Sequence, residues 1–405
     1  MRGAPATADA PSGAEERRQF RAFVQDEPSR KVVDQAVGDL MIPNAAVQRG
    51  GIADAVRELG ARRSPRILVV DVTGVDLPLS AVNELAEVCE PGVTVIAIGD
   101  RNDVGLFRDL INHGVSDYLV KPLTPGLVQK SLMAVLDSAS QGRSSQRLGR
   151  LVAVTGTRGG VGATLVATSV AWSIAHRRRR RCALVDLDLQ FGTAALALDL
   201  EPSNGLREAL EHPSRIDSLF VDRAMSKASE TLYVLGGEEP LGETLLPDYA
   251  ALEVLLKELR NRFHYVVVDL PRQVSPCTQH ILQAATNLVL VTDLSLAGMR
   301  DTLRYAALLP AVNASCQLAI CANRVGEHRR GEIGRGEFEA AVGRPVDAVL
   351  PFDGRTVAAA CNVGQPVVAG RGKVAAGLDE FAERICGGPS PAKRRLFGLW
   401  PGRRP

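Results

Sequence analysis

Residues 154–164 read VTGTRGGVGAT, a glycine-rich segment between an apolar strand and an apolar helical stretch. In this context, backbone N–H groups and a helix N-terminus can bind phosphate groups. The standard phosphate-binding loop reads GxxxxGK followed by Ser or Thr, and Gly162 and Thr164 fit that pattern. Thr157 holds the first glycine position and Ala163 the lysine position. The segment therefore predicts a loop that has the shape of a phosphate site but lacks its lysine.

Carboxylates follow two apolar strands further along the chain. The segment CALVDLDLQFG places Asp186 and Asp188 at the end of one strand, and FHYVVVDLP places Asp269 at the end of another. In open α/β sheets, ligands bind at the carboxyl ends of the strands. We therefore expect Asp269 to lie near Mg²⁺ at the phosphate loop. The segment CANRV places Asn323 at the end of a later strand.

A second candidate site lies in the first half of the chain. Asp71 ends the strand in RILVVDVTG, and Lys121 follows the strand in DYLVKPLT. This pair resembles response-regulator receiver domains, in which the Asp accepts a phosphoryl group and the Lys pairs with it. The resemblance predicts Asp71 as a phosphoacceptor, with Asp26 and Lys121 beside it.

The receiver pattern is incomplete in this chain. Receivers carry an acidic pair after the first strand to hold Mg²⁺, and here FVQDEP supplies Asp26 and Glu27 while Gln25 replaces one acid. Gly99 stands where a Ser or Thr would sense the phosphate. We therefore favour a degenerate receiver used for docking or dimerisation over one that is phosphorylated.

The elements that position these residues alternate along the chain in a βα pattern. In the first half we expect strands at Phe20–Val24, Ala45–Gln48, Ile67–Asp71, Val93–Ile98 and Asp117–Val120. Helices include Leu79–Cys89, Val104–His113 and Pro125–Leu136. In the second half we expect strands that include Leu151–Val154, Cys182–Asp186, Tyr265–Asp269, Leu288–Thr292 and Leu318–Asn323. Such alternation implies parallel sheets with helices on both faces.

The predicted fold class is therefore α/β, with two doubly wound parallel-sheet domains. The first is a receiver-like (βα)5 domain and the second a P-loop NTPase domain. The predicted boundaries are a disordered segment at 1–18, the receiver-like domain at 19–137, a linker at 138–149, the NTPase domain at 150–387 and a basic tail at 388–405.

Composition gives little reason to expect nucleic acid or a secreted protein. The net charge is +2, which is too small for a global field that attracts DNA. Seven scattered cysteines form no CxxC pair, as is typical of reduced thiols in the cytoplasm. No apolar run reaches the roughly 18 residues that span a bilayer. The N-terminus has no apolar segment of a secretory signal.

The loop, the carboxylate segments and Asn323, in this order and spacing, resemble the MinD/ParA family of deviant P-loop ATPases. The family loop reads KGGxGK followed by Ser or Thr, and its first lysine reaches across a nucleotide-sandwich dimer to the phosphates on the other subunit. Arg158 holds that position here. The resemblance implies ATP or ADP and Mg²⁺ as cofactors, and a homodimer as the assembled state.

The resemblance also implies a role for each matching residue. Asp188 would orient the attacking water, and Asp188 and Arg158 would be the catalytic residues. Thr164, Asp186 and Asp269 would hold or support Mg²⁺. Asn323 would recognise adenine. The loop residues that would contact the nucleotide are Gly159, Gly160, Val161, Gly162, Ala163 and Thr164.

Ala163 is the departure with the largest chemical consequence. A charge-assisted hydrogen bond contributes roughly 1.5–3 kcal/mol, so its loss weakens nucleotide binding by about 10- to 100-fold. The effect on turnover is larger, because the lysine stabilises charge in the transition state. We expect nucleotide binding with slow or absent hydrolysis. The alternative is a purely structural glycine turn.

Two basic segments are candidate contact surfaces. The run His176–Arg181 (HRRRRR) lies between a helix and a strand, where basic residues complement the helix C-terminus. We favour a solvated loop over a DNA, lipid or partner surface. The tail segment Lys393–Trp400 (KRRLFGLW) mixes basic and apolar residues, but Gly398 and Pro401 interrupt any long helix. We favour an unstructured tail over a peripheral membrane contact.

A degenerate receiver fused to such an ATPase domain looks like the TadZ/CpaE proteins of Flp/Tad pilus assembly, and septum-site-determining proteins have a similar layout. The leading hypothesis is a cytoplasmic, ATP-dependent dimeric switch that positions a pilus, secretion or division apparatus, at the inner face of the membrane, a pole or the septum. The alternatives are a pseudo-ATPase scaffold and a ParA-like DNA partition protein, and the near-neutral charge makes nucleic acid an unfavoured partner.

Overall fold

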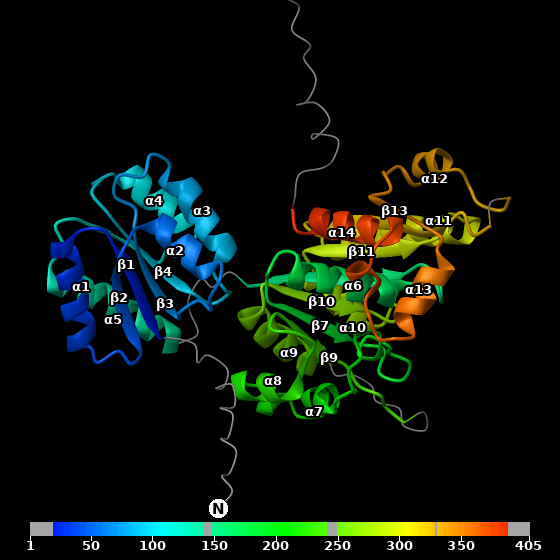
Figure 1. Ribbon diagram of the computed structural model, residues 1–405, viewed down its shortest axis with the longest axis horizontal. Helices are drawn as coiled ribbons and strands as arrows, with labels where there is room; N and C mark the ends of the chain where they lie inside the picture. The colour runs from blue at the N-terminus through cyan, green and yellow to red at the C-terminus, as the bar shows by residue number, and fades with distance from the viewer. Residues whose placement is uncertain (1–18, 141–147, 241–248, 329, 388–405) are drawn as a thin grey trace, which may run out of the picture. The chain divides into compact units, whose positions relative to one another are not determined.

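The chain is described from a computed structural model, which covers residues 19–140, 148–240, 249–328 and 330–387 (Figure 1). It divides into two compact units between residues 147 and 148. The predicted disordered segment 1–18, the basic tail 388–405 and most of the predicted linker lie outside the described residues.

The first unit is a five-stranded parallel sheet in the order β2-β1-β3-β4-β5. Its strands are β1 (Phe20–Val24), β2 (Ala45–Arg49), β3 (Ile67–Asp71), β4 (Thr94–Gly99) and β5 (Asp117–Val120). Its helices are α1 (Glu27–Asp39), α2 (Ile52–Leu59), α3 (Pro78–Val88), α4 (Val104–Asn112) and α5 (Pro125–Ser140). The predicted (βα)5 pattern is present, and α5 extends through the first residues of the predicted linker.

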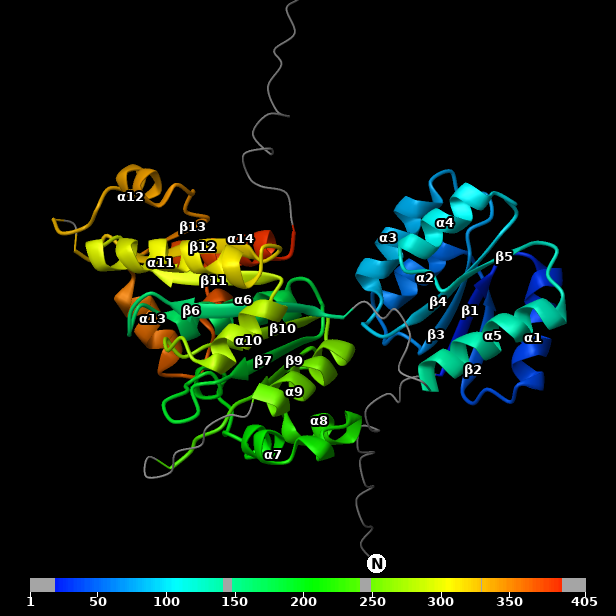
Figure 2. The same cartoon turned by 180° about the vertical axis from the view of Figure 1, so that it is seen from behind.

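Alternation along the strands explains why this sheet is covered on both faces. In β3, Ile67 and Val69 pack with α1 and α5, whereas Leu68 and Val70 pack with α2, α3 and α4. Successive side chains of a strand point to opposite faces, so a strand that is apolar at every position needs helices on both sides. Figures 1 and 2 show the two helical layers from opposite sides.

The second unit is built on an eight-stranded sheet in the order β13-β12-β11-β6-β10-β7-β9-β8. All its strand pairs are parallel except β8 with β9. Its strands are β6 (Arg150–Gly156), β7 (Cys182–Asp186), β8 (Ser226–Lys227), β9 (Leu232–Leu235), β10 (Tyr265–Asp269), β11 (Asn287–Thr292), β12 (Gln317–Val325) and β13 (Ala348–Pro351). The predicted α/β fold class is confirmed.

Helices cover both faces of this second sheet. They are α6 (Ala163–His176), α7 (Gly205–Glu211), α8 (Ser218–Ala224), α9 (Tyr249–Arg262), α10 (Pro276–Ala284), α11 (Leu296–Val312), α12 (Arg335–Val342), α13 (Gly354–Cys361) and α14 (Lys373–Ile385), with short 3-10 turns η1 (Leu196–Leu198), η2 (Pro213–Arg215) and η3 (Val367–Ala369). Helices α6 and α14 pack on one face (Figure 1), and α9, α10 and α11 pack on the other (Figure 2).

Helix α6 follows the phosphate loop and is buried along most of its length, from Val166 to Ala175. Small and apolar residues on all sides allow it to lie between the sheet and α14. Ser173 in α6 hydrogen-bonds Asp379 in α14, which satisfies a polar group inside this contact. The loop is therefore anchored at its C-terminal end by a fully packed helix.

Candidate functional site

The glycine segment forms the loop between β6 and α6, and Thr157 anchors its first half. The Thr157 N–H donates to the Val291 carbonyl at 2.9 Å, and the buried Thr157 hydroxyl lies 3.0 Å from that of Thr292. Thr157 thus fixes the loop to β11. Gly156 is required beside it, because a Cβ atom there would lie 2.7 Å from the Val161 side chain.

Two glycines in the loop adopt left-handed backbone conformations. Gly160 has φ +74° and Gly162 has φ +95°, which other residues rarely adopt. A Cβ atom on Gly162 would also overlap the Asn323 side chain. By contrast, no atom lies within 4 Å of the Cβ positions at Gly159 and Gly160. The loop is therefore closely held on one side and open on the other.

Position 163, where the standard lysine is missing, begins α6. The Ala163 side chain is half-buried and packs against the core between the sheet and α6. Thr164 follows in the first turn, and its side chain lies close enough to the Asp269 carboxylate to lower the pKa of that group. The hydroxyl predicted for the metal and the buried acid are therefore in contact.

The carboxylates predicted from the sequence meet beside this loop. Asp269 and Asp186 are register partners on the adjacent strands β10 and β7. Asp186 accepts from the N–H of Asp188 at 3.1 Å and of Ala194 at 3.0 Å. The Asp188 carboxylate accepts from the Phe191 N–H at 3.1 Å, and so caps the turn that follows β7.

Burial perturbs both inner carboxylates. Burial raises the pKa of Asp269 to about 8, and the neighbouring Asp186 carboxylate raises it further. The interaction with the Thr164 side chain acts in the opposite direction and lowers this pKa. Burial also raises the pKa of Asp186. Two adjacent buried acids of this kind are disfavoured in their charged forms unless a cation neutralises them.

These donors fit Mg²⁺ that arrives with a nucleotide better than a resident metal centre. No group of three or more His, Cys, Asp or Glu side chains in the described part of the chain is arranged to hold a metal ion. Mg²⁺ is typically bound by one or two protein oxygens together with substrate phosphates and water. Thr164, Asp269 and Asp186 offer hard oxygen ligands of this type.

Arg158, predicted to act across a dimer, is engaged within its own chain. Its guanidinium donates to the Asp293 carboxylate at 2.8 Å and to the Ser295 hydroxyl at 3.3 Å. Both partners lie at the start of α11, where Ser295 caps the helix. The Arg158 side chain is 46% exposed, so the ion pair is accessible to solvent.

The end of β12 contacts the loop through two consecutive side chains. Asn323 donates to the Val161 carbonyl at 2.8 Å, and Arg324 donates to the Gly160 carbonyl at 2.9 Å. Asn323 therefore supports the loop directly, and recognition of adenine by this residue stays a prediction. Sequence reasoning did not identify Arg324, Asp293 or Ser295, because no motif marks them.

The basic run after α6 is largely paired within the chain. Arg177 lies near Asp379 and stacks over Trp172, and Arg178 lies near Glu383. Arg181 lies over the rings of Tyr233 and Phe263. These contacts favour the interpretation of the run as a solvated loop that closes α6.

In the first unit, Asp71 is fully buried and hydrogen-bonded at both carboxylate oxygens. One oxygen accepts from the Gln25 N–H at 3.0 Å and from Lys121 at 2.7 Å, and the other accepts from the Thr73 N–H at 3.0 Å. Lys121 also pairs with Asp26. The three predicted residues are thus in contact, but every Asp71 oxygen is occupied.

Asp26 has a local structural role in addition to its contact with Lys121. Its carboxylate accepts from the Ser29 N–H at 2.8 Å and caps α1. The hydrogen bonds from Lys121 and Ser29 lower the pKa of Asp26 to about 2 despite the opposing effect of burial. This acid is therefore already committed to a helix cap and an ion pair.

Gly99 lies under an inward-facing aromatic ring. A Cβ atom at this position would overlap the Tyr118 hydroxyl, which donates to the Arg101 carbonyl at 3.0 Å. The Ser or Thr of the receiver pattern could not be placed here without moving Tyr118. The packing of β4 against β5 therefore leaves no room for a hydroxyl-bearing side chain at position 99.

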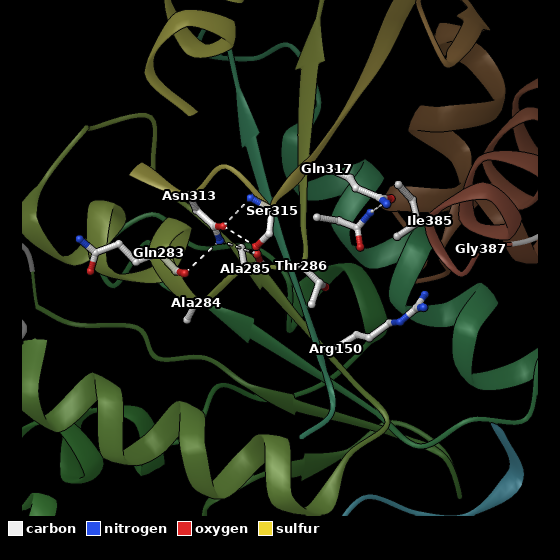
Figure 3. A pocket seen from close by; sticks show the side chains of 11 residues that line it. Arg150, Gln283, Ala284, Ala285, Thr286, Asn313, Ser315, Gln317, Ile385 and Gly387 are labelled. Carbon is white, nitrogen blue, oxygen red and sulfur yellow. Dashed lines mark hydrogen bonds between the residues drawn. The ribbon is translucent and has the colours of Figure 1, made fainter. Parts of the chain in front are cut away.

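A separate cavity of about 360 Å³ lies at the opposite, amino-terminal edge of the second sheet (Figure 3). Arg150, Asn287 and Gln317 line it, together with the end of α10 and Asn313. None of the predicted nucleotide-site residues reaches it.

In the described residues, no helix has the length and apolar character needed to cross a membrane.

The doubly wound sheet, the glycine loop before α6 and the carboxylates on β7 and β10 define the second unit as a P-loop NTPase domain. Residues 149–314 match a family described as the AAA domain. This unit has the P-loop NTPase fold of MinD-like proteins, and its sequence is similar to that of MinD/ParA-type proteins.

Three known proteins illustrate the similarity. A septum site-determining protein MinD of Thermotoga maritima is 24% identical over 59% of this chain and 89% of its own length. The structure of the septum site-determining protein MinD complexed with Mg-ADP from Pyrococcus horikoshii has a TM-score of 0.52 and 21% identity, covering 59% of this chain and 96% of that one. A pilus assembly protein CpaE from Caulobacter crescentus is 32% identical over 29% of this chain and 97% of its own, with a TM-score of 0.27.

Proposed function

We propose that this protein binds ATP or ADP, together with Mg²⁺, at the loop between β6 and α6. The observation that carries the proposal is the contact of Thr164 with the buried Asp269, beside a loop with left-handed glycines. Bound Mg²⁺ would neutralise phosphate charge. Thr164 and Asp269 would hold it, with Asp186 orienting the turn around Asp188.

We further propose that nucleotide drives dimerisation and that hydrolysis is weak. Ala163 supplies no charge to the phosphates, so turnover loses the stabilisation that a loop lysine provides. Arg158 would leave Asp293 and reach the phosphates bound to a second subunit. Asp188 lies at the end of β7, where it would orient water. The protein would then act mainly as a binding switch.

We propose a general function for the switch and leave the specific apparatus that it positions to the identity of its partner. Nucleotide-dependent spatial positioning is the general function that the relatives support. Whether the apparatus is a Flp/Tad pilus, a secretion complex or a division septum depends on a partner. The names of the similar proteins include both septum site determination and pilus assembly.

A pseudo-ATPase scaffold is the second candidate function. Three observations favour it: Ala163 at the lysine position, the Arg158–Asp293 ion pair, and the three hydrogen bonds that the Asp71 carboxylate accepts in the first unit. In this alternative both units serve as docking surfaces. The ParA-like DNA alternative is less favoured, because the arginines of the 176–181 run make internal contacts.

Titration of the full-length protein with ATP and Mg²⁺ separates these functions. We expect calorimetry to show binding and sedimentation to show dimerisation. Arg158→Ala should keep nucleotide binding and lose the dimer, whereas Arg215→Ala, a control arginine at an exposed site, should keep both. No binding at millimolar ATP would leave the scaffold as the function. Hydrolysis that Asp188→Ala abolishes would show a stronger enzyme than we propose.

A further inference from the structure

Arg324 has an unusual backbone conformation for its position. It lies within β12 and has φ +60°, in the left-handed region that non-glycine residues seldom adopt. Side chains in such conformations cost free energy and persist where the surrounding structure enforces them, often at functional sites. The contacts of Arg324 indicate what this conformation achieves.

The register of β12 explains how Arg324 reaches the loop. Between Ala322 and Val325 the pairing with β13 shifts, so that β12 contains one extra residue there. Successive residues of a regular strand point to opposite faces, but a bulge re-aims a side chain. Because of this irregularity, the consecutive residues Asn323 and Arg324 both contact the phosphate loop.

The two contacts fix two consecutive peptide groups. Asn323 holds the Val161 carbonyl, and Arg324 holds the Gly160 carbonyl. In a trans peptide, the carbonyl of one residue and the N–H of the next point in opposite directions. Fixing these carbonyls therefore turns the N–H groups of Val161 and Gly162 away from β12. Within the described residues, neither N–H group makes a hydrogen bond.

Charge adds to this orientation. A guanidinium on the Gly160 carbonyl polarises that peptide and makes the Val161 N–H a stronger donor, since hydrogen bonds in a chain strengthen one another. Consecutive N–H groups around a left-handed residue form an anion-binding concavity. In this chain the concavity matters more than usual, because Ala163 brings no ammonium group to the phosphates.

Other contacts hold the Arg324 guanidinium in place through atoms other than the nitrogen that donates to the Gly160 carbonyl. Its second terminal nitrogen pairs with Glu327 at 2.7 Å, and its guanidinium lies 5.8 Å from the centre of the Phe352 ring. The side chain is 43% exposed. The planar group is thus oriented from two sides while one nitrogen donates to Gly160.

We propose that Arg324 is a positioning residue of the nucleotide site, which orients and polarises the loop N–H groups and so offsets part of the charge missing at Ala163. The inference rests on the proposed nucleotide binding. It assigns to Arg324 an effect through the loop peptide, with no contact to the nucleotide itself.

Arg324→Asn tests this proposal, because Asn tolerates left-handed backbone and lacks the charge. In the full-length protein, we expect affinity for Mg²⁺-ATP by calorimetry to fall about 10-fold, as for loss of a charged hydrogen bond. The unfolding temperature without nucleotide should stay the same or rise, since backbone strain is relieved. Arg324→Lys, which keeps a cationic donor, should restore most of the affinity.

Arg215→Asn is the matched control, because it removes an exposed arginine that pairs with Glu208 and does not contact the loop; its affinity should equal the wild type. If Arg324→Asn and Arg324→Lys both bind as tightly as the wild type, Arg324 has no role in positioning. A lower unfolding temperature with unchanged affinity would also overturn the proposal. Absence of binding by the wild type would instead refute the proposed nucleotide function.

Discussion

At the scale of single residues, position 163 carries a methyl group beside a loop that has the shape of a phosphate site. Ala163 is half-buried against the core, while Thr164 contacts Asp269. The neighbouring residues therefore keep the contacts expected of an NTPase, and one side chain lacks its charge. Adding a lysine at position 163 therefore tests whether the loop binds the phosphates of a nucleotide.

Ala163→Lys should raise affinity for Mg²⁺-ATP by about 10-fold, because it adds one charge-assisted hydrogen bond to the phosphates. Any hydrolysis should rise more than affinity does. Calorimetry and phosphate-release assays measure the two effects. Ala340→Lys, which adds the same charge at an exposed site on α12, should change neither. Unaltered binding in the loop variant would mean that the loop is only a structural turn.

Asp269 should make the stability of the protein without nucleotide fall as pH rises. Its pKa is about 8 in the folded protein and near 4 in an unfolded chain. Between these values the folded state binds more protons, so the free energy of unfolding decreases with increasing pH. We expect a loss of up to about 2–3 kcal/mol from pH 5 to pH 7.

Asp269→Asn should flatten this dependence, as measured by denaturant unfolding at several pH values. Some slope should remain, because burial also raises the pKa of Asp186. The exposed Asp222→Asn is the control and should leave the slope unchanged. An equal slope in Asp269→Asn and in the wild type would contradict a raised pKa at this site.

At the scale of elements, the phosphate loop is tied to the start of α11 and to the end of β12. Arg158 pairs with Asp293 at the first of these contacts, and Asn323 and Arg324 form the second. The side chains come from different βα units and meet because parallel strands end at one edge of the sheet. A change at α11 can therefore affect Arg158 without touching the loop backbone.

Asp293→Asn should release Arg158 and strengthen ATP-dependent dimerisation several-fold, if dimerisation requires Arg158 to leave its own chain. The stability of the monomer should change by less than about 1 kcal/mol, since the pair is solvent-exposed. Sedimentation with and without Mg²⁺-ATP measures the first effect. Asp222→Asn, which removes the partner of Arg262 elsewhere, serves as the control. A weaker dimer in Asp293→Asn would show that Asp293 supports the assembled state.

At the scale of the whole molecule, two parallel α/β units differ in how their predicted sites are occupied. In the second unit the loop is open around Gly159 and Gly160. In the first unit Asp71 is buried and its oxygens accept three hydrogen bonds from Gln25, Lys121 and Thr73. This difference supports a nucleotide-binding second unit and a first unit that acts by docking.

Treatment of the full-length protein with a small phosphodonor should add no phosphoryl group at Asp71, as intact-mass and peptide mass spectrometry would show. Asp71→Ala should destabilise the first unit by about 3 kcal/mol or more, because it leaves Lys121 and two N–H donors without this partner. Asp76→Ala, at an exposed site after β3, should have little effect. Phosphorylation of Asp71 would show that the unit opens and acts as a receiver.

Most of the fold follows from the sequence by itself. Continuous apolar strands such as Ile67–Asp71 and Tyr265–Asp269 coincide with β3 and β10, because strands covered on both faces carry no polar positions. The short strands β8, β9 and β13, which lie towards the two edges of the second sheet, are not among the strands predicted from the sequence. The predicted end of α5 at Leu136 is too early, because the helix continues to Ser140 through a polar last turn that carries no capping signal.

The candidate site, like the fold, is determined partly by local sequence patterns and partly by tertiary contacts. The sequence by itself determined the glycine loop, the carboxylates on β7 and β10, and the absence of a cation at Ala163, because these depend on residue type within a local pattern. Only the tertiary structure decided that Arg158 pairs with Asp293, that Arg324 holds the loop and that the buried Asp71 carboxylate pairs with Lys121 and two N–H groups. Those contacts join residues far apart in the chain, and their geometry depends on sheet register, a bulge and the packing of helices.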